Sequence, residues 1–412
     1  MNPYRILAIL AALLAVTILS ACEAVVGEPE APRWADWSRQ GGLRIGHLDE
    51  PGYAFGPVGS MAVAPDGSVI TAHPRDLEIR VWTQEGKPAG MVGRAGQGPG
   101  EYRRIGEIGL EGDTLWVMDM ASHRVTRYDL DGDLVGSSPL SIDPRGQRSD
   151  PTLGRPRPSH PLGDGTFYGR QSGVIPQISG RDSTPVLHLR LDDGGAVLDT
   201  ALVVHTRPRD VMAVPGQGGS WLYGYQPFSD RRIAGFGLSS ETLVVVDQPT
   251  PEPGAGATFR VTRISMTGDT LLQQDIPYEP RAVEADEVDR VVTSLVRRWK
   301  AQPAGSGIAD AELERKARKA LFVPASHPPI AAVVPGRDGK IWLLKTRREG
   351  SEAWWSVLDG EGRPLACVLL PINFRMRVAE REHVWGVSSG GWGVPYITRY
   401  DLGPAGSASG DG

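Results

Sequence analysis

The sequence predicts an all-β protein assembled from repeated four-stranded units, and three observations support this class. Glycine and proline are abundant, with 52 and 34 copies among 412 residues. Segments with helical periodicity are scarce. Short alternating strands recur along the chain, and each ends in a tight turn that contains glycine or an acidic residue. Many short strands at regular spacing are typical of sandwiches, barrels and propellers.

An internal repeat occupies the second hairpin of each unit. Residues 125–133 (VTRYDLDGD) recur as 261–269 (VTRISMTGD) and again as 397–403 (ITRYDLG). The looser copies lie at 79–86, 187–194 and 354–362. A hairpin precedes each copy, with turns at 64–67, 110–113, 162–165, 238–241, 336–339 and 380–382. Two hairpins make a four-stranded blade, so six units predict a six-bladed β-propeller. A sandwich fold with a chance repeat is the alternative.

The two ends of the chain are expected to complete this ring. The sixth unit begins near Phe374 and has only three strands before the chain ends. Residues 42–48 (GLRIGHL) can supply the missing fourth strand, and such closure removes open sheet edges. We therefore expect a propeller over residues 42–403 and a disordered Gly/Ser-rich tail over 404–412.

The N-terminus carries an export signal. Ile6 to Leu19 is an apolar run that is too short to span a membrane but suits a signal peptide. The run ends in Leu19-Ser20-Ala21-Cys22, which resembles the lipobox of bacterial lipoproteins. The resemblance implies a signal peptide over 1–21, acyl chains on Cys22, a tether over 22–41 and a membrane as partner. Because Glu23 rather than aspartate follows, it also implies the outer membrane. An ordinary secretory signal with a chance cysteine is the alternative.

Further motifs carry a family resemblance. Residues 93–102 (GRAGQGPGEY), 115–119 (LWVMD) and 122–125 (SHRV) resemble bacterial six-bladed propeller lipoproteins related to NHL-repeat proteins. The resemblance extends over roughly residues 43–402. It implies the fold but not the function, because propellers serve in binding, scaffolding and hydrolysis alike.

The long connections are expected on one face of the propeller, where blade-to-blade connectors and second-to-third strand turns lie. They are 93–106, 141–161, 170–185, 206–232, 248–258 and 278–328. Long loops on a rigid scaffold are frequent binding sites. Together these loops carry an excess of positive charge, although the net charge of the chain is −5. Our candidate binding residues are Arg103, Arg104, Arg207, Arg209, Arg231 and Arg232. Arginine forks suit carboxylate or phosphate partners. The alternative is that these arginines pair with nearby acidic residues.

The 278–328 connection interrupts the strand pattern. Val288, Val291, Val292, Leu295, Val296 and Trp299 recur at helical spacing. Asp310 is a candidate N-cap of a second helix that ends at Leu321. We expect a helical insertion between blades four and five. It could cover the channel, dock a partner or pack on the rim.

The chemical motifs in the sequence point to no catalytic residue. Gly386-Val387-Ser388-Ser389-Gly390 matches the nucleophile elbow of serine hydrolases but lies between two strands, without the helix that this elbow needs. The Asp129-x-Asp131-x-Asp133 segment is better explained as a hairpin turn than as a calcium loop. Cys367 lies in an apolar run and is expected to be a packed thiol. The eight histidines show no zinc spacing. No cofactor is evident, although a divalent metal in the channel, held from several blades, is a possibility that spacing does not test.

Two functions follow as hypotheses. The first is a non-catalytic binding or scaffolding lipoprotein whose Arg-rich, long-loop face engages a protein or an anionic ligand. The second is a metal-dependent hydrolase or lyase of the lactonase-like propeller kind, with its site in the central channel. Nucleic acid is not expected, because the compartment is extracytoplasmic and no aromatic-basic platform is present.

Overall fold

The computed structural model describes residues 34–46, 52–140, 153–251, 256–380 and 382–405. The chain from Arg33 onward forms one compact unit. The predicted signal peptide, Cys22 and the predicted tail residues 406–412 lie outside the described residues. Among the described helices, none is long and apolar enough to cross a membrane.

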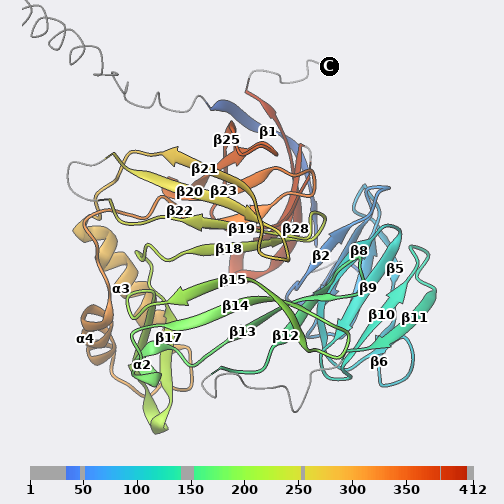
Figure 1. The fold of residues 1–412 in the computed structure, drawn as a ribbon, viewed down its shortest axis with the longest axis horizontal. Helices are drawn as coiled ribbons and strands as arrows, with labels where there is room; N and C mark the ends of the chain where they lie inside the picture. Colours follow the sequence, from blue (N-terminus) through green and yellow to red (C-terminus); the bar gives the residue numbers. More distant parts are fainter. Residues whose placement is uncertain (1–33, 47–51, 141–152, 252–255, 381, 406–412) are drawn as a thin grey trace, which may run out of the picture. The chain divides into compact units, whose positions relative to one another are not determined.

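The described strands form six blades of four strands each (Figure 1). Four blades are separate four-stranded sheets, and the last two are joined edge to edge in one eight-stranded sheet. Blade one is β2 (Met61–Val63), β3 (Val69–His73), β4 (Glu78–Trp82) and β5 (Pro88–Met91). Blade two is β8 (Ile105–Glu111), β9 (Thr114–Asp119), β10 (Arg124–Tyr128) and β11 (Leu134–Pro139). Blade three is β12 (Arg157–Pro161), β13 (Phe167–Ser172), β14 (Thr184–Leu191) and β15 (Val197–Thr206).

The second half of the chain repeats this plan. Blade four is β18 (Ile233–Gly237), β19 (Thr242–Asp247), β20 (Thr258–Ile264) and β21 (Thr270–Pro277). Blade five is β22 (Ile330–Pro335), β23 (Ile341–Glu349), β24 (Glu352–Leu358) and β25 (Pro364–Pro371). Blade six is β26 (Phe374–Glu380), β27 (His383–Ser389), β28 (Pro395–Pro404) and β1 (Ala35–Ile45). Each blade runs antiparallel, with short turns between its first and second strands.

The core of the propeller lies between blades rather than within them. Each pair of neighbouring blades encloses its own cluster of buried side chains, including the pair formed by the last and the first blade. Between blades three and four, the ring of Tyr168 stacks on that of Phe236 at 4.1 Å and 7°. Between blades six and one, Ile45 and Trp385 pack with Met61 and Trp82. The ring is therefore closed by hydrophobic packing, which contributes about 25 cal/mol per Å² of apolar surface buried.

The N-terminal strand closes the ring as predicted, but it begins earlier than expected. β1 pairs antiparallel with β28, from Trp37↔Pro404 to Ile45↔Ile397. Its first residues also pair parallel with β25, with Ala35 opposite Ala366. We expected a strand from residue 42 and a tether up to 41. Residues 35–41 are mostly polar and exposed, so they lack the apolar alternation that marks a strand. Backbone pairing to two neighbouring strands holds them instead.

The helical insertion lies between blades four and five, as predicted, with α3 (Ala285–Lys300) and α4 (Asp310–Ala320). Val292, Leu295 and Trp299 of α3 are buried. Ala309 rather than Asp310 is the N-cap of α4, and Asp310 is the first helical residue, with its carboxylate 3.0 Å from Lys300. An acidic residue there is stabilised by the helix dipole even without a capping bond.

The helices pack on a hairpin in a segment for which we predicted a long loop. Within the predicted 206–232 connection, β16 (Val211–Pro215) and β17 (Trp221–Tyr225) form a two-stranded ribbon. One face of this ribbon, with Met212, Val214 and Leu222, shares a buried cluster with α3 and α4. Figure 1 shows α3 and α4 at one side of the molecule, next to β17 and the short helix α2 (Pro176–Ser179). The insertion thus packs against this hairpin.

The remaining short elements support the connections. β6 (Arg94–Ala95) and β7 (Glu101–Tyr102) pair within the glycine-rich connector of blades one and two, and two 3₁₀ turns span Gln217–Gly219 and Gly391–Gly393. The Glu101 carboxylate accepts the backbone N–H groups of Gln97 and Gly98. Tyr102 is buried edge-on against Tyr128. This motif is therefore a structural connector.

Candidate functional site

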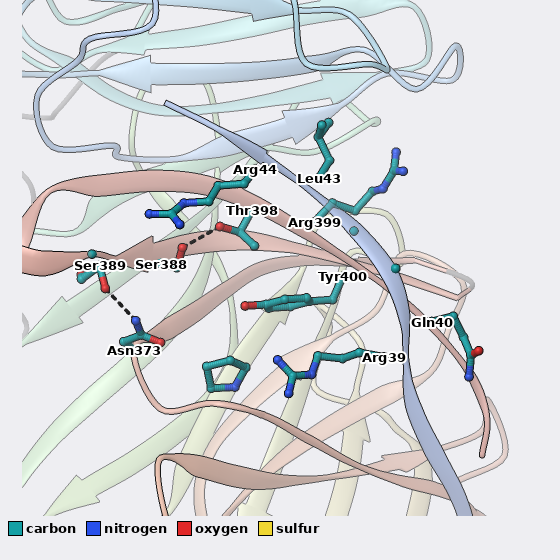
Figure 2. Close-up of a pocket in the computed structure, with 14 residues that line it drawn as sticks. Arg39, Gln40, Leu43, Arg44, Asn373, Ser388, Ser389, Thr398, Arg399 and Tyr400 are labelled. Atoms are coloured by element: carbon teal, nitrogen blue, oxygen red, sulfur yellow. Dashed lines mark hydrogen bonds between the residues drawn. The ribbon is translucent and has the colours of Figure 1, made fainter. Parts of the chain in front are cut away.

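A cleft of about 820 Å³ lies beside the closing strand. We call it the closure cleft, and it is lined by Arg39, Gln40, Gly41, Gly42, Leu43, Arg44, Pro371, Asn373, Ser388, Ser389, Gly390, Thr398, Arg399 and Tyr400 (Figure 2). Its volume falls within the range of about 300–1,000 Å³ typical of small-molecule sites. Unlike most such sites, its lining is rich in polar and charged groups.

The path of β1 creates the cleft. β1 pairs with β25 only through Trp37 and then follows β28 alone, so the outer strands of blades five and six separate beyond that point. Gly41 and Gly42 lie where β1 follows β28. A Cβ on Gly42 would lie 2.4 Å from the carbonyl oxygen of Arg399. Glycine is therefore required for this close approach, and it also leaves the cleft without side chains at these positions.

Arg39 connects the two walls of the cleft. Its guanidinium lies 2.5 Å from the carboxylate of Glu352 in blade five and 5.5 Å from the centre of the Tyr400 ring in blade six. The ion pair compensates its charge within the protein. Arg399 is compensated in a similar way by Asp401, at 2.7 Å, and the same carboxylate lies 2.9 Å from His383.

Arg44 differs from both of these arginines. Its guanidinium carbon lies 3.4 Å from the centre of the Tyr396 ring, which is a cation–π contact. Within the described part of the chain it has no ion pair and no side-chain hydrogen bond. Arg44 thus presents at the edge of the cleft a positive charge that no described acidic group pairs with, and its planar fork suits a carboxylate or a phosphate.

Hydroxyl and amide groups surround this charge. The Asn373 side chain donates to the carbonyl of Ser389 at 2.6 Å, and the hydroxyls of Ser388 and Thr398 share a 2.6 Å hydrogen bond. Figure 2 shows Arg44, Ser389 and Asn373 together at one end of the cleft and the Tyr400 ring at its centre. Arg44, Asn373 and Ser389 lie at or beside strand ends, on the side of the blade-to-blade connectors and the second-to-third strand turns. This end of the cleft is therefore on the same side as the long loops.

The Gly-x-Ser-x-Gly segment contributes to the cleft without a nucleophile's surroundings. Ser388 and Ser389 end β27, and a 3₁₀ turn at Gly391–Gly393 follows in place of the long helix that a nucleophile elbow needs. The hydroxyl of Ser388 is bonded to Thr398, and no histidine lines the cleft. A serine without a base in reach is not activated for attack.

Three of the four predicted arginines in the 206–232 connection are engaged by carboxylates. Arg207 lies 2.8 Å from both Asp210 and Asp230, and Arg209 lies 3.0 Å from Asp230. Arg232 pairs with Asp247. Burial opposes ionisation of Asp210, but hydrogen bonds from Arg207 and Ser229 hold its pKa below the usual value. These three arginines therefore pair with nearby acidic residues, which was the alternative to a ligand-binding role.

The other three candidates are placed differently. The guanidinium of Arg231 stacks 4.5 Å above the centre of the Tyr225 ring and has no carboxylate partner among the described residues. Arg103 and Arg104 are exposed, and their backbone N–H groups donate to the buried carboxylate of Asp119. None of the six predicted arginines lines the closure cleft. Arg39 and Arg44 were missed because they lie before the first long loop.

The central channel holds a smaller cavity, of about 100 Å³. The inner strands of blades one, two, four, five and six contribute its lining, which is mostly apolar and carries two arginines, Arg337 and Arg377. Arg337 donates to the carbonyl of Val63 and lies 2.9 Å from Glu380. No aspartate, glutamate, histidine or cysteine lines this cavity.

This lining does not fit a divalent metal. Calcium, magnesium and zinc require oxygen, nitrogen or thiolate donors, whereas arginine donates hydrogen bonds only. Across the described residues, no group of three or more His, Cys, Asp or Glu side chains is placed to hold a metal ion. The hypothesis of a metal-dependent channel enzyme therefore gains no support from the geometry of the described residues.

Comparison with known proteins supports the architecture. A family model described as a 6-bladed beta-propeller (DUF5128) matches residues 69–146, from β3 through the end of blade two. The chain is a six-bladed β-propeller. No curated protein matches this chain in sequence.

Solved structures of other propellers align with the chain at low identity. An inferred exported protein of Bacteroides fragilis aligns over 92% of this chain and 98% of its own, at 9% identity and a TM-score of 0.42. A DUF4221 family member of Bacteroides vulgatus aligns over 90% of this chain and 99% of its own, at 9% identity and a TM-score of 0.45. A catalytically inactive virginiamycin B lyase of Staphylococcus aureus aligns over 89% and 99%, at 11% identity and a TM-score of 0.38. Likenesses of this size carry no argument about function.

Proposed function

We propose that this propeller is a lipid-anchored, extracytoplasmic binding protein that holds a small anionic ligand in the closure cleft. The observation that carries the proposal is the guanidinium of Arg44, which stacks on Tyr396 at the edge of the cleft of about 820 Å³ and pairs with no described carboxylate. The hydroxyl and amide groups beside it can bind the polar part of a ligand, and the Tyr400 ring offers a face for a sugar-sized ring. A binding role agrees with the lack of an activated nucleophile in the cleft.

The anchor is the part of this proposal that rests on sequence alone. The apolar run before Cys22 and the lipobox-like Leu19-Ser20-Ala21-Cys22 support export and acylation. β1 begins at Ala35, within the predicted 22–41 tether, and forms one wall of the cleft.

Thermal unfolding in the presence of matched ligands tests the binding role. D-Glucuronate and glucose 6-phosphate present an anion on a sugar ring, and neutral glucose is the control. A ligand that binds only the native state raises the unfolding temperature by mass action. We expect stabilisation by the anionic sugars, no effect of glucose, and loss of the stabilisation in Arg44→Gln.

A matched variant separates the cleft from general surface charge. Arg315 lies on α4, and its side chain is 77% exposed. Arg315→Gln removes the same charge far along the sequence from the cleft, and we expect it to respond to the anionic sugars as the natural protein does. Equal stabilisation of Arg44→Gln and the natural protein would contradict the proposed site.

A further inference from the structure

One face of the β16–β17 ribbon is aromatic. No described sheet or helix covers this face. Met212, Val214 and Leu222 occupy the face toward α3 and α4. Because side chains alternate along a strand, Trp221, Tyr223 and Tyr225 lie on the other face. Tyr223 is 64% exposed and Tyr225 is 61% exposed. Three aromatic residues in a row on one exposed face are characteristic of interaction surfaces.

The two edges of this ribbon differ. The N–H of Gln226 donates to Asp210 and that of Gly216 to Ser220. In an antiparallel ladder, the N–H and C=O groups of Val211 and Ala213 and the C=O of Pro215 therefore point away from β17. On this β16 edge two of the three outward carbonyls are occupied. Gln177 of α2 donates to Val211, and Lys316 of α4 donates to Pro215 at 2.8 Å.

The β17 edge is open. By the same register, the N–H and C=O groups of Trp221, Tyr223 and Tyr225 point away from β16. In the described part of the chain, these groups have no hydrogen-bond partner. An exposed edge of this kind is a template for an added strand, and proteins usually block such edges with charge, proline or a covering element. Here one edge is covered and the other is not.

A cation lies beside the open edge. The guanidinium of Arg231 is 4.5 Å from the centre of the Tyr225 ring and has no carboxylate partner among the described residues. Burial of this side chain lowers the pKa of Arg231, which means that its charge is poorly solvated. An acidic group at this position would form an ion pair with Arg231, like the pairs that Arg207 and Arg209 form with aspartates.

We propose that β17 binds an extended, acidic polypeptide segment of a partner protein as a third strand of the ribbon. Backbone groups of Tyr223 and Tyr225 would pair with the segment, the aromatic face would pack its alternate side chains, and Arg231 would contact a carboxylate. A second copy of this chain is a poorer fit, because pairing of two five-residue strands buries far less than the roughly 1,200 Å² of a stable dimer. Self-pairing would also add no negative charge. This proposal is independent of the closure cleft.

Fluorescence anisotropy with a defined probe tests this proposal on the soluble chain that starts after Cys22. The probe is a fluorescein-labelled octapeptide of alternating valine and glutamate, and the control replaces every glutamate by lysine. We expect saturable binding of the acidic probe alone. Tyr223→Pro should weaken binding about tenfold or more, because proline removes the outward N–H. At an edge position this change leaves the ribbon's own ladder intact. Arg231→Gln should weaken binding of the acidic probe without admitting the lysine peptide.

A matched control distinguishes the edge from nonspecific apolar contact. Leu271, on the outer strand β21, is 56% exposed, and Leu271→Ala should bind the acidic probe as the natural chain does. Unchanged unfolding temperatures verify that the variants fold. Unaltered affinity in Tyr223→Pro would overturn the proposal. So would concentration-dependent dimerisation that Tyr223→Pro abolishes, because it would make a second copy the occupant.

Discussion

The guanidinium of Arg44 and the ring of Tyr396 lie 3.4 Å apart at the edge of the closure cleft, on two strands that more than 350 residues of chain separate. This stacking fixes the direction of a charge that no described acidic group compensates. The closure of the ring by β1 is what brings the two residues together. The strand pairing that closes the ring therefore also forms the candidate site.

Removing the Tyr396 ring should lower the affinity for an anionic ligand more than it lowers the stability of the fold. Cation–π contacts at exposed sites contribute about 0.5–1 kcal/mol, so Tyr396→Leu should weaken the binding of D-glucuronate about two- to fivefold. Isothermal titration calorimetry measures this change. An unchanged affinity would show that Arg44 does not need the ring for its orientation.

Ile45 should be a main determinant of ring closure. It is 1% exposed and packs in the cluster between blades six and one. Ile45→Ala should lower the free energy of unfolding by about 2–5 kcal/mol, because it leaves a cavity at the junction of the chain's two ends. Urea unfolding measures the loss. Val135→Ala, at a side chain 61% exposed on β11, is the control and should change little.

The Asp230 carboxylate should be important for the 206–232 connection. Its side chain is 5% exposed and accepts hydrogen bonds from Arg207, Arg209 and Thr250. Asp230→Asn leaves both arginines without this charge, and we expect a loss of about 3 kcal/mol in the free energy of unfolding. Asp286→Asn, which breaks an exposed pair with Arg290 on α3, should have little effect. Equal effects of the two variants would contradict a structural role of the buried network.

Buried histidines should make the propeller sensitive to mild acid. Burial lowers the pKa of His160 and of His188 to about 4. In the unfolded chain these groups titrate near the usual value of about 6.5. Between these two values the unfolded state binds protons that the native state does not. Stability should therefore fall as the pH is lowered from about 6.5 to about 4, by about 1.4 kcal/mol per pH unit for each histidine.

Urea unfolding at pH 7.5 and pH 5 measures this dependence. The ring of His160 contacts those of Trp116, Tyr168 and Phe236, so phenylalanine can replace it with similar packing. His160→Phe should reduce the loss of stability at pH 5. If the variant and the natural protein lose the same amount, His160 is not one of the groups responsible.

Acylation should depend on Cys22. The lipobox-like segment predicts that the natural protein incorporates radiolabelled palmitate in cells and sediments with membranes. Cys22→Ser should lose the label and appear in the soluble extracytoplasmic fraction. A labelled Cys22→Ser protein would contradict the proposed anchor.

The repeat pattern in the sequence was sufficient to predict the blades, because strand alternation and glycine turns are local properties. The 125–133 and 261–269 segments each form the hairpin that their turns predict. The helical spacing of Val292, Leu295 and Trp299 likewise located α3. The start of β1 was missed because residues 35–41 are polar and are held by backbone pairing with β25 and β28.

The candidate site could not be predicted from local patterns of strands, turns and helices. Arg44 and Tyr396 acquire their relationship only through ring closure, and sequence spacing contains no information about it. The arginines of the 206–232 connection were recognised, but their pairing with Asp210 and Asp230 depends on how this segment folds back on itself. The alternation Trp221-x-Tyr223-x-Tyr225 was a usable strand signal within a segment that we had treated as a loop.

A crystal structure of the propeller with D-glucuronate tests whether the closure cleft is the ligand site. We expect a sugar in the closure cleft, with its carboxylate at the guanidinium of Arg44 and its ring near Tyr400. The same crystals of Arg44→Gln should show an empty cleft. A sugar bound in the central channel, or an empty cleft at saturating concentration in the natural protein, would contradict the account.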